Sequence, residues 1–422
     1  MQTFLAYLLT IILSLAGIFG GGTPSSPQST GLAPGQGAII QGEGALLREG
    51  PGVDYPVVDT IPKGQRVQIV ETRNGWYYIT TPESEGWIAA WLLRADGSTP
   101  YLSTNKARQM VGYYVEDGRG ASYAALTEHS HLIDTVAIWS YMLDDQGELQ
   151  GQSTARVLDH AGQANIKTLA LIHNYREPAF DATMITELLS NPQNRRRAVE
   201  NIYNTLTRWG YSGVNIDLEN VPAEQRDNLT AFMAELAARL RPANLLVTMS
   251  VPAKTGKHNW HAAYDYRALA PHVDQMMLMT YDEHYRDGPP GPIASIGWVE
   301  DVIQYATKHI PREKLFLGIA GYGYNWEERG PDQWQAAALT EKQARTLAQT
   351  KNVPIQWDEQ AKVSYFTYTD VGRRHQVYFE DSYSLAHKLF LVNKYDLAGI
   401  ALWRLSYESP AFWETAARGL KP

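Results

Sequence analysis

The sequence predicts an α/β protein whose main part is a parallel (β/α)8 TIM barrel, preceded by a small all-β barrel. From about residue 108 to residue 422, strand-like apolar runs alternate with amphipathic helical segments, as they do in consecutive βαβ units. Eight such runs occur, which is the number of strands that closes this kind of barrel. Before them, residues 38–95 carry short β-rich runs separated by turn signals, and 422 residues leave room for two domains.

Helical patterns fill most of the gaps between the eight predicted barrel strands. In residues 195–209, for example, Val199, Ile202 and Leu206 recur at helical spacing. Further helices are expected at residues 223–240 and 382–395. The predicted barrel strands are residues 110–115, 135–141, 168–173, 213–219, 245–251, 275–281, 315–319 and 399–403.

The segment between the seventh and eighth predicted strands is too long to be an ordinary loop. It contains a strand-like run at residues 363–368, so we expect a small α+β insertion at about 323–380 that walls one side of the active-site groove. The predicted boundaries are 1–19 for a signal peptide or membrane anchor, 20–37 for a Gly/Pro/Ser linker, 38–95 for the small domain, 96–107 for a second linker and 108–422 for the barrel.

The small domain has turn signals at residues 50–52, 62–64 and 74–75, between strand-like runs such as 66–70 and 76–79. Its segments Leu47-Arg48-Glu49-Gly50-Pro51, Asp54-Tyr55-Pro56-Val57, Asn74-Gly75-Trp76-Tyr77 and Glu85-Gly86-Trp87-Ile88 resemble the bacterial Src-homology-3-like domain. Such domains commonly accompany cell-wall enzymes, so the resemblance implies binding to the wall. Trp76 and Trp87 can equally be core residues, because so small a domain needs large apolar side chains inside.

Composition narrows the class of partner and the compartment. A formal net charge of −8 without a long basic run argues against nucleic acid as a partner. Cysteine is absent, which excludes disulfides, thiolate metal sites and lipoprotein attachment. The apolar run at residues 4–19 predicts an exported bacterial protein, acting outside the cell, in the wall or anchored to the membrane. Ser14-Leu15-Ala16 offers a cleavage site, but no Lys or Arg precedes the run, so cleavage and a retained anchor both stay open.

Residues 213–219 carry the strongest chemical signal, because polar and aliphatic residues alternate there with the period of a strand. Val214, Ile216 and Leu218 can pack outward under the helices, so Asn215, Asp217 and Glu219 must point into the barrel, which normally holds branched aliphatics. Two carboxylates buried this close repel each other, and the repulsion raises the pKa of at least one. Glu219 comes last on the strand, nearest the rim where barrel enzymes bind substrates, and is the predicted proton donor.

These residues also carry a family resemblance. Gly213-Val214-Asn215-Ile216-Asp217-Leu218-Glu219 resembles the D-G-x-D-x-D-x-E signature on the fourth strand of family 18 glycoside hydrolases. Met279-Thr280-Tyr281-Asp282 is similar to the family's sixth-strand motif, Trp403 to its eighth-strand tryptophan and Val111-Gly112-Tyr113-Tyr114 to its first strand. Within the family, the sequence is most similar to the spore-germination and cortex-lytic branch. Ser212 and Asn215 depart from the signature, and His173-Asn174 stand where many chitinases carry Gly-Gly.

The resemblance implies a substrate-assisted retaining mechanism, in which the 2-acetamido oxygen of the sugar attacks the anomeric carbon. Glu219 would then be the acid and base, Asp217 would orient the acetamide and Tyr281 would bind its oxygen. No cofactor and no metal are implied. The resemblance assigns further substrate contacts to Asn215, Asp282, Trp403 and Tyr114.

The expected partner is a polysaccharide of the bacterial cell wall, peptidoglycan or spore cortex, bound by a monomeric enzyme. Three alternatives remain: a chitinase acting on chitin oligomers, a non-catalytic glycan-binding barrel, and a metal-dependent deacetylase. The last rests on His258 and His261 followed by Asp265. The presence of Glu219 favours catalysis over binding alone, because lectin-like relatives typically lose the acidic residue.

Overall fold

The computed structural model describes residues 32–34, 36–40, 45–52, 55–81, 84–95, 107–116, 118–258, 261–358 and 360–421. The predicted signal or anchor at 1–19 lies outside these residues, as do most of the predicted linkers at 20–37 and 96–107. The chain forms two compact units, Met1–Tyr101 and Leu102–Pro422, which are described separately. In the part of the chain that the structure describes, no helix is long and apolar enough to cross a membrane.

The N-terminal unit is a small all-β barrel, as predicted. Its seven strands form one antiparallel sheet in the order β3-β2-β6-β5-β4-β1-β7. The turn between β4 and β5 is the two-residue hairpin that its sequence indicated, with Asn74 and Gly75 at φ of 48° and 78°. The strands are β1 (Gly37–Ile40), β2 (Ala45–Arg48), β3 (Val57–Ile61), β4 (Arg66–Arg73), β5 (Trp76–Thr80), β6 (Glu85–Ala89) and β7 (Leu93–Ala95).

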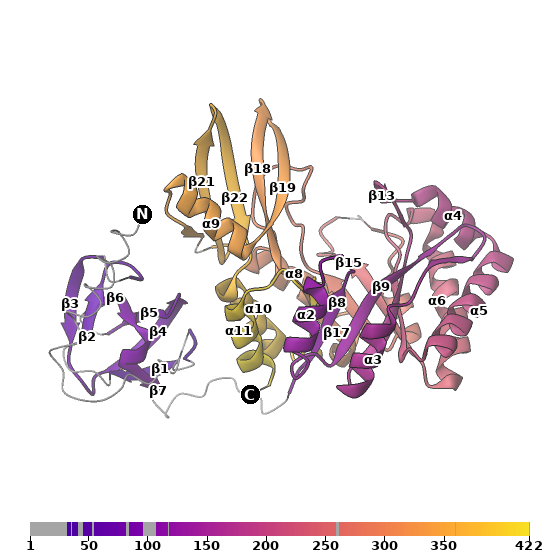
Figure 1. The fold of residues 1–422 in the computed structure, drawn as a ribbon, viewed down its shortest axis with the longest axis horizontal. Coiled ribbons are helices and arrows are strands. Elements are labelled where there is room, and N and C mark those ends of the chain that lie inside the picture. Colours follow the sequence, from indigo (N-terminus) through magenta and orange to yellow (C-terminus); the bar gives the residue numbers. More distant parts are fainter. Residues whose placement is uncertain are drawn as a thin grey trace. The chain divides into compact units, whose positions relative to one another are not determined.

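The C-terminal unit contains a closed barrel of eight parallel strands surrounded by helices, which confirms the predicted (β/α)8 fold (Figure 1). Closure comes from the pairing of the last strand with the first. The fourth and sixth strands are each two residues shorter than predicted. The barrel strands are β8 (Gln109–Tyr114), β9 (Thr135–Leu143), β11 (Lys167–His173), β14 (Gly213–Asp217), β15 (Leu246–Pro252), β16 (Gln275–Met279), β17 (Leu315–Ala320) and β23 (Gly399–Trp403).

Helices cover the outside of the barrel and bury the outward side chains of its strands. The longest, α5 (Pro192–Trp209), starts with Asn191 accepting a hydrogen bond from the Gln193 N–H and ends at Gly210 with a φ of 71°. The other helices are α2 (Ala121–Glu128), α3 (Ala155–Gln163), α4 (Ala182–Ser190), α6 (Arg226–Leu240), α7 (Tyr266–Leu269), α8 (Ile296–Ala306), α10 (Ser382–Lys394) and α11 (Pro410–Leu420).

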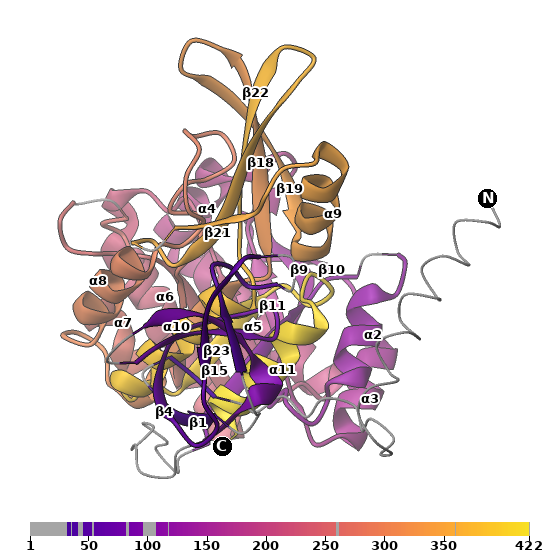
Figure 2. The same ribbon diagram turned by 90° about the vertical axis from the view of Figure 1, so that its left-hand side faces the viewer.

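The predicted α+β insertion after the seventh barrel strand is present. It is an antiparallel sheet in the order β19-β18-β22-β21-β20 with one helix, and the hairpins that contain β18 and β22 project from the unit (Figure 2). Its elements are β18 (Tyr322–Gly330), β19 (Gln333–Thr340), α9 (Glu341–Lys351), β20 (Gln356–Asp358), β21 (Val363–Asp370) and β22 (Arg373–Phe379).

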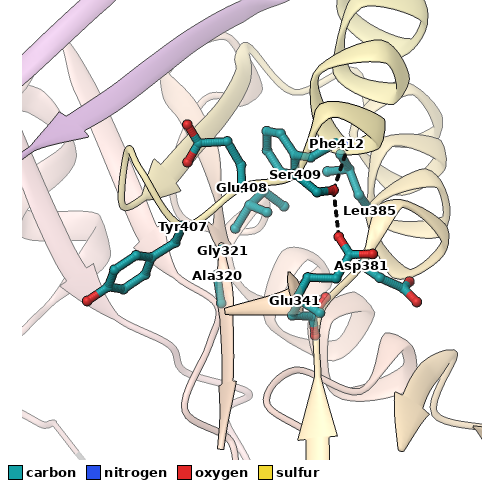
Figure 3. Close-up of a pocket in the computed structure, with 11 residues that line it drawn as sticks. Ala320, Gly321, Glu341, Asp381, Leu385, Tyr407, Glu408, Ser409 and Phe412 are labelled. Carbon is teal, nitrogen blue, oxygen red and sulfur yellow. Dashed lines mark hydrogen bonds between the residues drawn. The ribbon is translucent and has the colours of Figure 1, made fainter. Parts of the chain in front are cut away.

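A polar junction joins the base of this insertion to the barrel. It surrounds a cavity of about 10 Å³, the space of one water molecule, lined in part by Glu341, Asp381 and Ser409 (Figure 3). The Ser409 hydroxyl donates a hydrogen bond to Glu341 Oε2 at 2.6 Å. Next to it, the buried Lys388 Nζ lies 2.5 Å from Glu380 Oε2, and both side chains are at most 5% exposed. This ion pair ties the middle of α10 to the residue that directly follows β22.

We expect Lys388→Met to destabilise the enzyme strongly, because it leaves the Glu380 carboxylate buried without its cation. The expected loss is about 3–5 kcal/mol in the free energy of unfolding, measured by urea denaturation. Lys394→Met is the matched control, since the Lys394–Glu300 pair is largely solvated and should contribute less than about 1 kcal/mol. Equal losses for the two variants would contradict this account. Adding Glu380→Gln to Lys388→Met should recover much of the loss.

Candidate active site

Most of the predicted site residues come together at one rim of the barrel, where the carboxyl ends of all eight strands meet. Glu219 lies two residues beyond the end of β14, and Tyr281 and Asp282 follow the end of β16. Trp403 is the last residue of β23. Their mutual electrostatic effects show that the polar members are neighbours: the charges of Asp217 and Asp282 both act on Glu219 and on Tyr281.

Asn215 lies deeper than the other site residues and is fully buried. Its Nδ2 donates to Ser250 Oγ at 3.0 Å, and its Oδ1 accepts from Thr248 Oγ1 at 2.9 Å. Ser250 also pairs with the Tyr113 hydroxyl at 2.8 Å and hydrogen-bonds Asp217. Asn215 is thus hydrogen-bonded to its neighbours inside the barrel, and its contact with the substrate stays a prediction.

Asp217 and Glu219 occupy an environment that favours their protonated forms. Burial raises the pKa of Asp217 to about 7, against the opposing effect of the Ser250 hydrogen bond. Burial also raises the pKa of Glu219 well above its usual value, and the negative charges of Asp217 and Asp282 raise it further. Among the described residues, Asp217 Oδ1 has no hydrogen-bond partner although it is buried. These shifts favour the protonated form of Glu219, and the Asp217 Oδ1 atom is available to accept a further hydrogen bond.

Tyr281 and Asp282 complete the polar side of the site. Burial raises the pKa of Tyr281 well above its usual value, and nearby Tyr113 and the carboxylates add to the effect, so its hydroxyl stays a neutral donor. Asp282 has a left-handed backbone with a φ of 58°, and its Oδ1 accepts a hydrogen bond of 2.7 Å from the Tyr322 hydroxyl. Burial raises the pKa of Asp282, while this hydrogen bond lowers it. Tyr322 thus links the insertion to the site.

Aromatic rings form the apolar side of the site. Trp403 lies edge-on to Tyr113, with ring centroids 5.5 Å apart, and 5.4 Å from Trp139. Trp139 in turn stacks on His173 at 4.4 Å, with 21° between the ring planes. His173 Nδ1 accepts a hydrogen bond from the Tyr175 N–H, and burial lowers the pKa of His173 to about 4. The imidazole is therefore neutral, with its proton on Nε2.

The structure places Tyr114 outside the group of site residues at the rim, and its contact with the substrate stays a prediction. Tyr114 is 1% exposed in the core between barrel and helices, and its hydroxyl donates to Glu116 Oε2 at 2.8 Å. Its neighbour Tyr113 points into the barrel instead. Sequence reasoning missed Tyr113 because residues 110–114 are apolar throughout, so the sequence contains no alternation that assigns the two faces of β8.

The deacetylase alternative receives no support from the geometry. Within the described residues, no group of three or more His, Cys, Asp or Glu side chains is arranged to hold a metal ion. Residues 259 and 260, between its two histidines, lie outside the described residues. Asp265, its acidic member, caps α7 by accepting from the N–H groups of Arg267 and Ala268.

Comparison with known proteins identifies the family. Residues 109–408 match the family described as glycosyl hydrolases family 18. The chain belongs to family 18. Residues 43–94 match the bacterial SH3 domain, so this family 18 glycoside hydrolase carries an SH3 domain before its barrel. Both resemblances inferred from the sequence are confirmed, and the family membership identifies the chain as an enzyme.

Relatives of this family 18 enzyme include cortex-lytic enzymes and chitinases. The cortical fragment-lytic enzyme of Bacillus subtilis (strain 168) is 30% identical over 68% of this chain and 68% of that protein. The structure of the spore cortex-lytic enzyme SleL of Bacillus megaterium QM B1551 has a TM-score of 0.70 and 25% identity, covering 81% of this chain and 79% of that one. A chitinase of Chromobacterium violaceum ATCC 12472 has a TM-score of 0.70 and 29% identity, covering 75% of this chain and 100% of that one.

The raised pKa of Asp217 predicts that Asp217→Asn stabilises the enzyme at high pH. Because the folded pKa exceeds the unfolded one, the folded state binds more protons, and the wild type loses stability as the pH rises from about 4 through about 7. The amide side chain of the Asp217→Asn variant does not ionise, so the variant does not lose this stability as the pH rises. We expect the variant to gain on the order of 2–4 kcal/mol relative to wild type between pH 4 and pH 8, measured by urea denaturation at each pH.

Asp159→Asn is the matched control, since Asp159 is solvent-exposed on α3 and should show no such difference. A pH-independent effect of Asp217→Asn would show that Asp217 is ionised throughout this range.

Proposed function

We propose that this enzyme cleaves glycosidic bonds next to N-acetylglucosamine in bacterial peptidoglycan, including spore cortex, by a substrate-assisted retaining mechanism. The observation that carries the proposal is the buried group formed by Asp217, Glu219 and Tyr281 at the barrel rim. It provides a protonated carboxyl group, a second carboxyl with an unpartnered oxygen and a neutral hydroxyl. These are the groups that the chemistry needs.

In the first step, the protonated Glu219 donates its proton to the leaving sugar oxygen while the acetamido oxygen of the substrate attacks the anomeric carbon. The bond from that carbon to the leaving oxygen breaks, and a cyclic intermediate forms on the sugar itself. In the second step, the Glu219 carboxylate takes a proton from water, which attacks the same carbon and reopens the ring. Two displacements at one carbon retain its configuration.

The other side chains support this sequence of bond changes. The unpartnered Asp217 Oδ1 accepts the acetamide N–H and stabilises the positive charge that develops on the ring. The Tyr281 hydroxyl donates to the acetamido oxygen and aims it at the anomeric carbon. Asp282 binds a sugar hydroxyl, and Trp403 forms the apolar floor under the sugar ring. The aromatic contacts of Trp403 with Tyr113 and Trp139 keep that floor rigid.

Three observations favour peptidoglycan over chitin. Relatives are named as cortex-lytic and cortical fragment-lytic enzymes. His173 and Asn174, at the wall of the site, stand where many chitinases carry two glycines. The insertion and the loop after β16 also line an open groove of about 570 Å³ whose charged residues include Arg286, Arg329 and Glu327. Arginines pair well with carboxylates, which peptide branches carry and chitin lacks.

We propose that the enzyme is an exported monomer that acts at the cell wall. The apolar run at residues 4–19 is the signal or anchor in this proposal, and the SH3 domain binds the wall. A tethered binding domain raises the local concentration of the barrel on an insoluble substrate without taking part in the chemistry.

Chitin oligomers are the second candidate substrate, because they present the same acetamide. The observation that favours them is the likeness to the Chromobacterium violaceum chitinase, at 29% identity over all of that chain.

We predict that Glu219→Gln folds normally but loses roughly 10²–10⁴-fold in turnover, because the amide keeps the volume of the side chain and has no proton to transfer. Turnover is measured as new reducing ends from N-acetylglucosamine oligomers, and binding is measured separately by calorimetry. Glu224→Gln, on the exposed turn before α6, is the matched control and should keep full activity. Wild-type turnover by Glu219→Gln would refute the assigned role. Rapid cleavage of fully de-N-acetylated polymer would refute substrate assistance.

We also predict faster hydrolysis of purified sacculi or cortex fragments than of chitin oligomers of matched length, with new reducing ends on N-acetylglucosamine. Arg286→Gln should reduce the rate on peptide-bearing strands and leave the rate on peptide-stripped strands unchanged, because only the branches carry carboxylates. The measurement is product analysis by mass spectrometry together with initial rates. A strong preference for chitin, or products that end in reducing muramic acid, would show that the substrate or the bond is wrong.

A further inference from the structure

The backbone of Glu219 lies beyond the reach of the barrel sheet. Parallel pairing of β14 with β11 ends at Asp217 opposite His173, and its pairing with β15 ends at Ile216. Leu218 and Glu219 therefore have no strand partner in the described part of the barrel. Glu219 also precedes a turn, since Asn220 has a left-handed backbone with a φ of 55°. A side chain on such a segment needs other contacts to hold it in place.

The side chain of Asn174 supplies those contacts on the β11 side. Its Oδ1 accepts a hydrogen bond from the Glu219 N–H at 2.8 Å, and its Nδ2 donates to the Glu219 carbonyl oxygen, also at 2.8 Å. The same Nδ2 lies 3.3 Å from the Asp181 carbonyl oxygen. Asn174 itself is fully buried, which strengthens its hydrogen bonds. These two hydrogen bonds extend the contact between β11 and β14 beyond their last backbone pair, His173 and Asp217.

A tyrosine holds the same segment from the side of the β15 loop. The Tyr264 hydroxyl donates to the Leu218 carbonyl oxygen at 2.7 Å and accepts from the Val221 N–H at 3.4 Å. Tyr264 is 1% exposed. Tyr264 therefore holds Leu218, directly before Glu219, and Val221, two residues after it. Asn174 holds Glu219 itself.

We propose that Asn174 and Tyr264 form a clamp that positions the Glu219 carboxyl group for proton transfer. The inference rests on the proposed role of Glu219 as acid and base. Both clamp residues act on its backbone, so they are positioning residues. Proton transfer requires the donor within hydrogen-bond reach of the leaving oxygen, and a displacement of about 1 Å can cost on the order of 10²-fold in rate.

The test compares wild type and Asn174→Ala on aryl β-glycosides of an N-acetylglucosamine oligomer whose leaving groups differ in pKa. Because kcat/KM reports the first bond cleavage, a poorly positioned acid should matter most for the most basic leaving groups. We expect losses of about 10–100-fold for the poorest leaving groups and less than about 3-fold for the best. The plot of log kcat/KM against leaving-group pKa should therefore become steeper, and the change should appear in kcat more than in KM.

Three further variants separate positioning from stability. Tyr264→Phe keeps the ring but loses the hydroxyl, so it should steepen the same plot, and it decides the question if Asn174→Ala does not fold. Asn174→Asp keeps the acceptor for the Glu219 N–H but adds a negative charge, which should move the basic limb of the pH profile to higher pH. Asn194→Ala is the structural control, because that buried amide donates to the Asp145 carbonyl oxygen at 2.8 Å. It should lower Tm and leave the plot unchanged.

Unchanged slopes in both Asn174→Ala and Tyr264→Phe would overturn the clamp, as would losses that are equal for all leaving groups. Glu219→Gln is measured on the same glycosides to separate this outcome from a failure of the proposed function. If Glu219→Gln is inactive on basic leaving groups while the clamp variants match wild type, only the clamp fails. If Glu219→Gln retains full activity, the role of Glu219 fails first.

Discussion

The structure of the site depends on the cost of burying carboxyl groups together. Asp217 is the last residue of β14, and Glu219 follows it on the same face. Asp282 adds a third carboxyl group after β16, which is separated from β14 by β15. Burial raises the pKa of all three carboxyl groups, and the charges of Asp217 and Asp282 raise the pKa of Glu219 further. These shifts favour the protonated Glu219 that the proposed mechanism requires. The same constraint opposes folding, so the surrounding protein has to stabilise an arrangement that is unfavourable by itself.

A few hydrogen-bonded polar side chains inside the otherwise apolar barrel stabilise these buried carboxyl groups. Thr248, Asn215, Ser250 and Tyr113 join three strands through hydrogen bonds below Asp217. Around them, aliphatic and aromatic side chains such as Phe316 exclude water. Low polarity strengthens each of these hydrogen bonds and makes an unsatisfied group expensive. The unpartnered oxygen of Asp217 is therefore an informative exception, because a substrate N–H can satisfy it.

Segments outside the barrel strands also line the site. The insertion supplies Tyr322 to Asp282, and a hairpin after β11 packs Tyr175 and Phe180 beside Trp139. Both additions lie in segments that connect barrel strands, where the chain can vary without a change in the barrel itself. His173 contributes here as a neutral aromatic ring, since burial keeps it from accepting a proton. A wall built on such loops can distinguish related glycans without altering the acid at Glu219.

The sequence by itself determined the barrel, the insertion and the inward direction of Asn215, Asp217 and Glu219, because these depend on periodicity along short stretches of chain. It did not determine which tyrosine of β8 enters the barrel, because apolar residues occupy both faces of that strand. It also gave no role to Asn174, whose partner Glu219 is 45 residues away, or to the pairing of Tyr113 with Ser250 across 137 residues. The direct pairing of β11 with β14 brings Asn174 to Glu219, and closure of the barrel brings Tyr113 to Ser250. These contacts depend on strand register and on loops that no local pattern encodes.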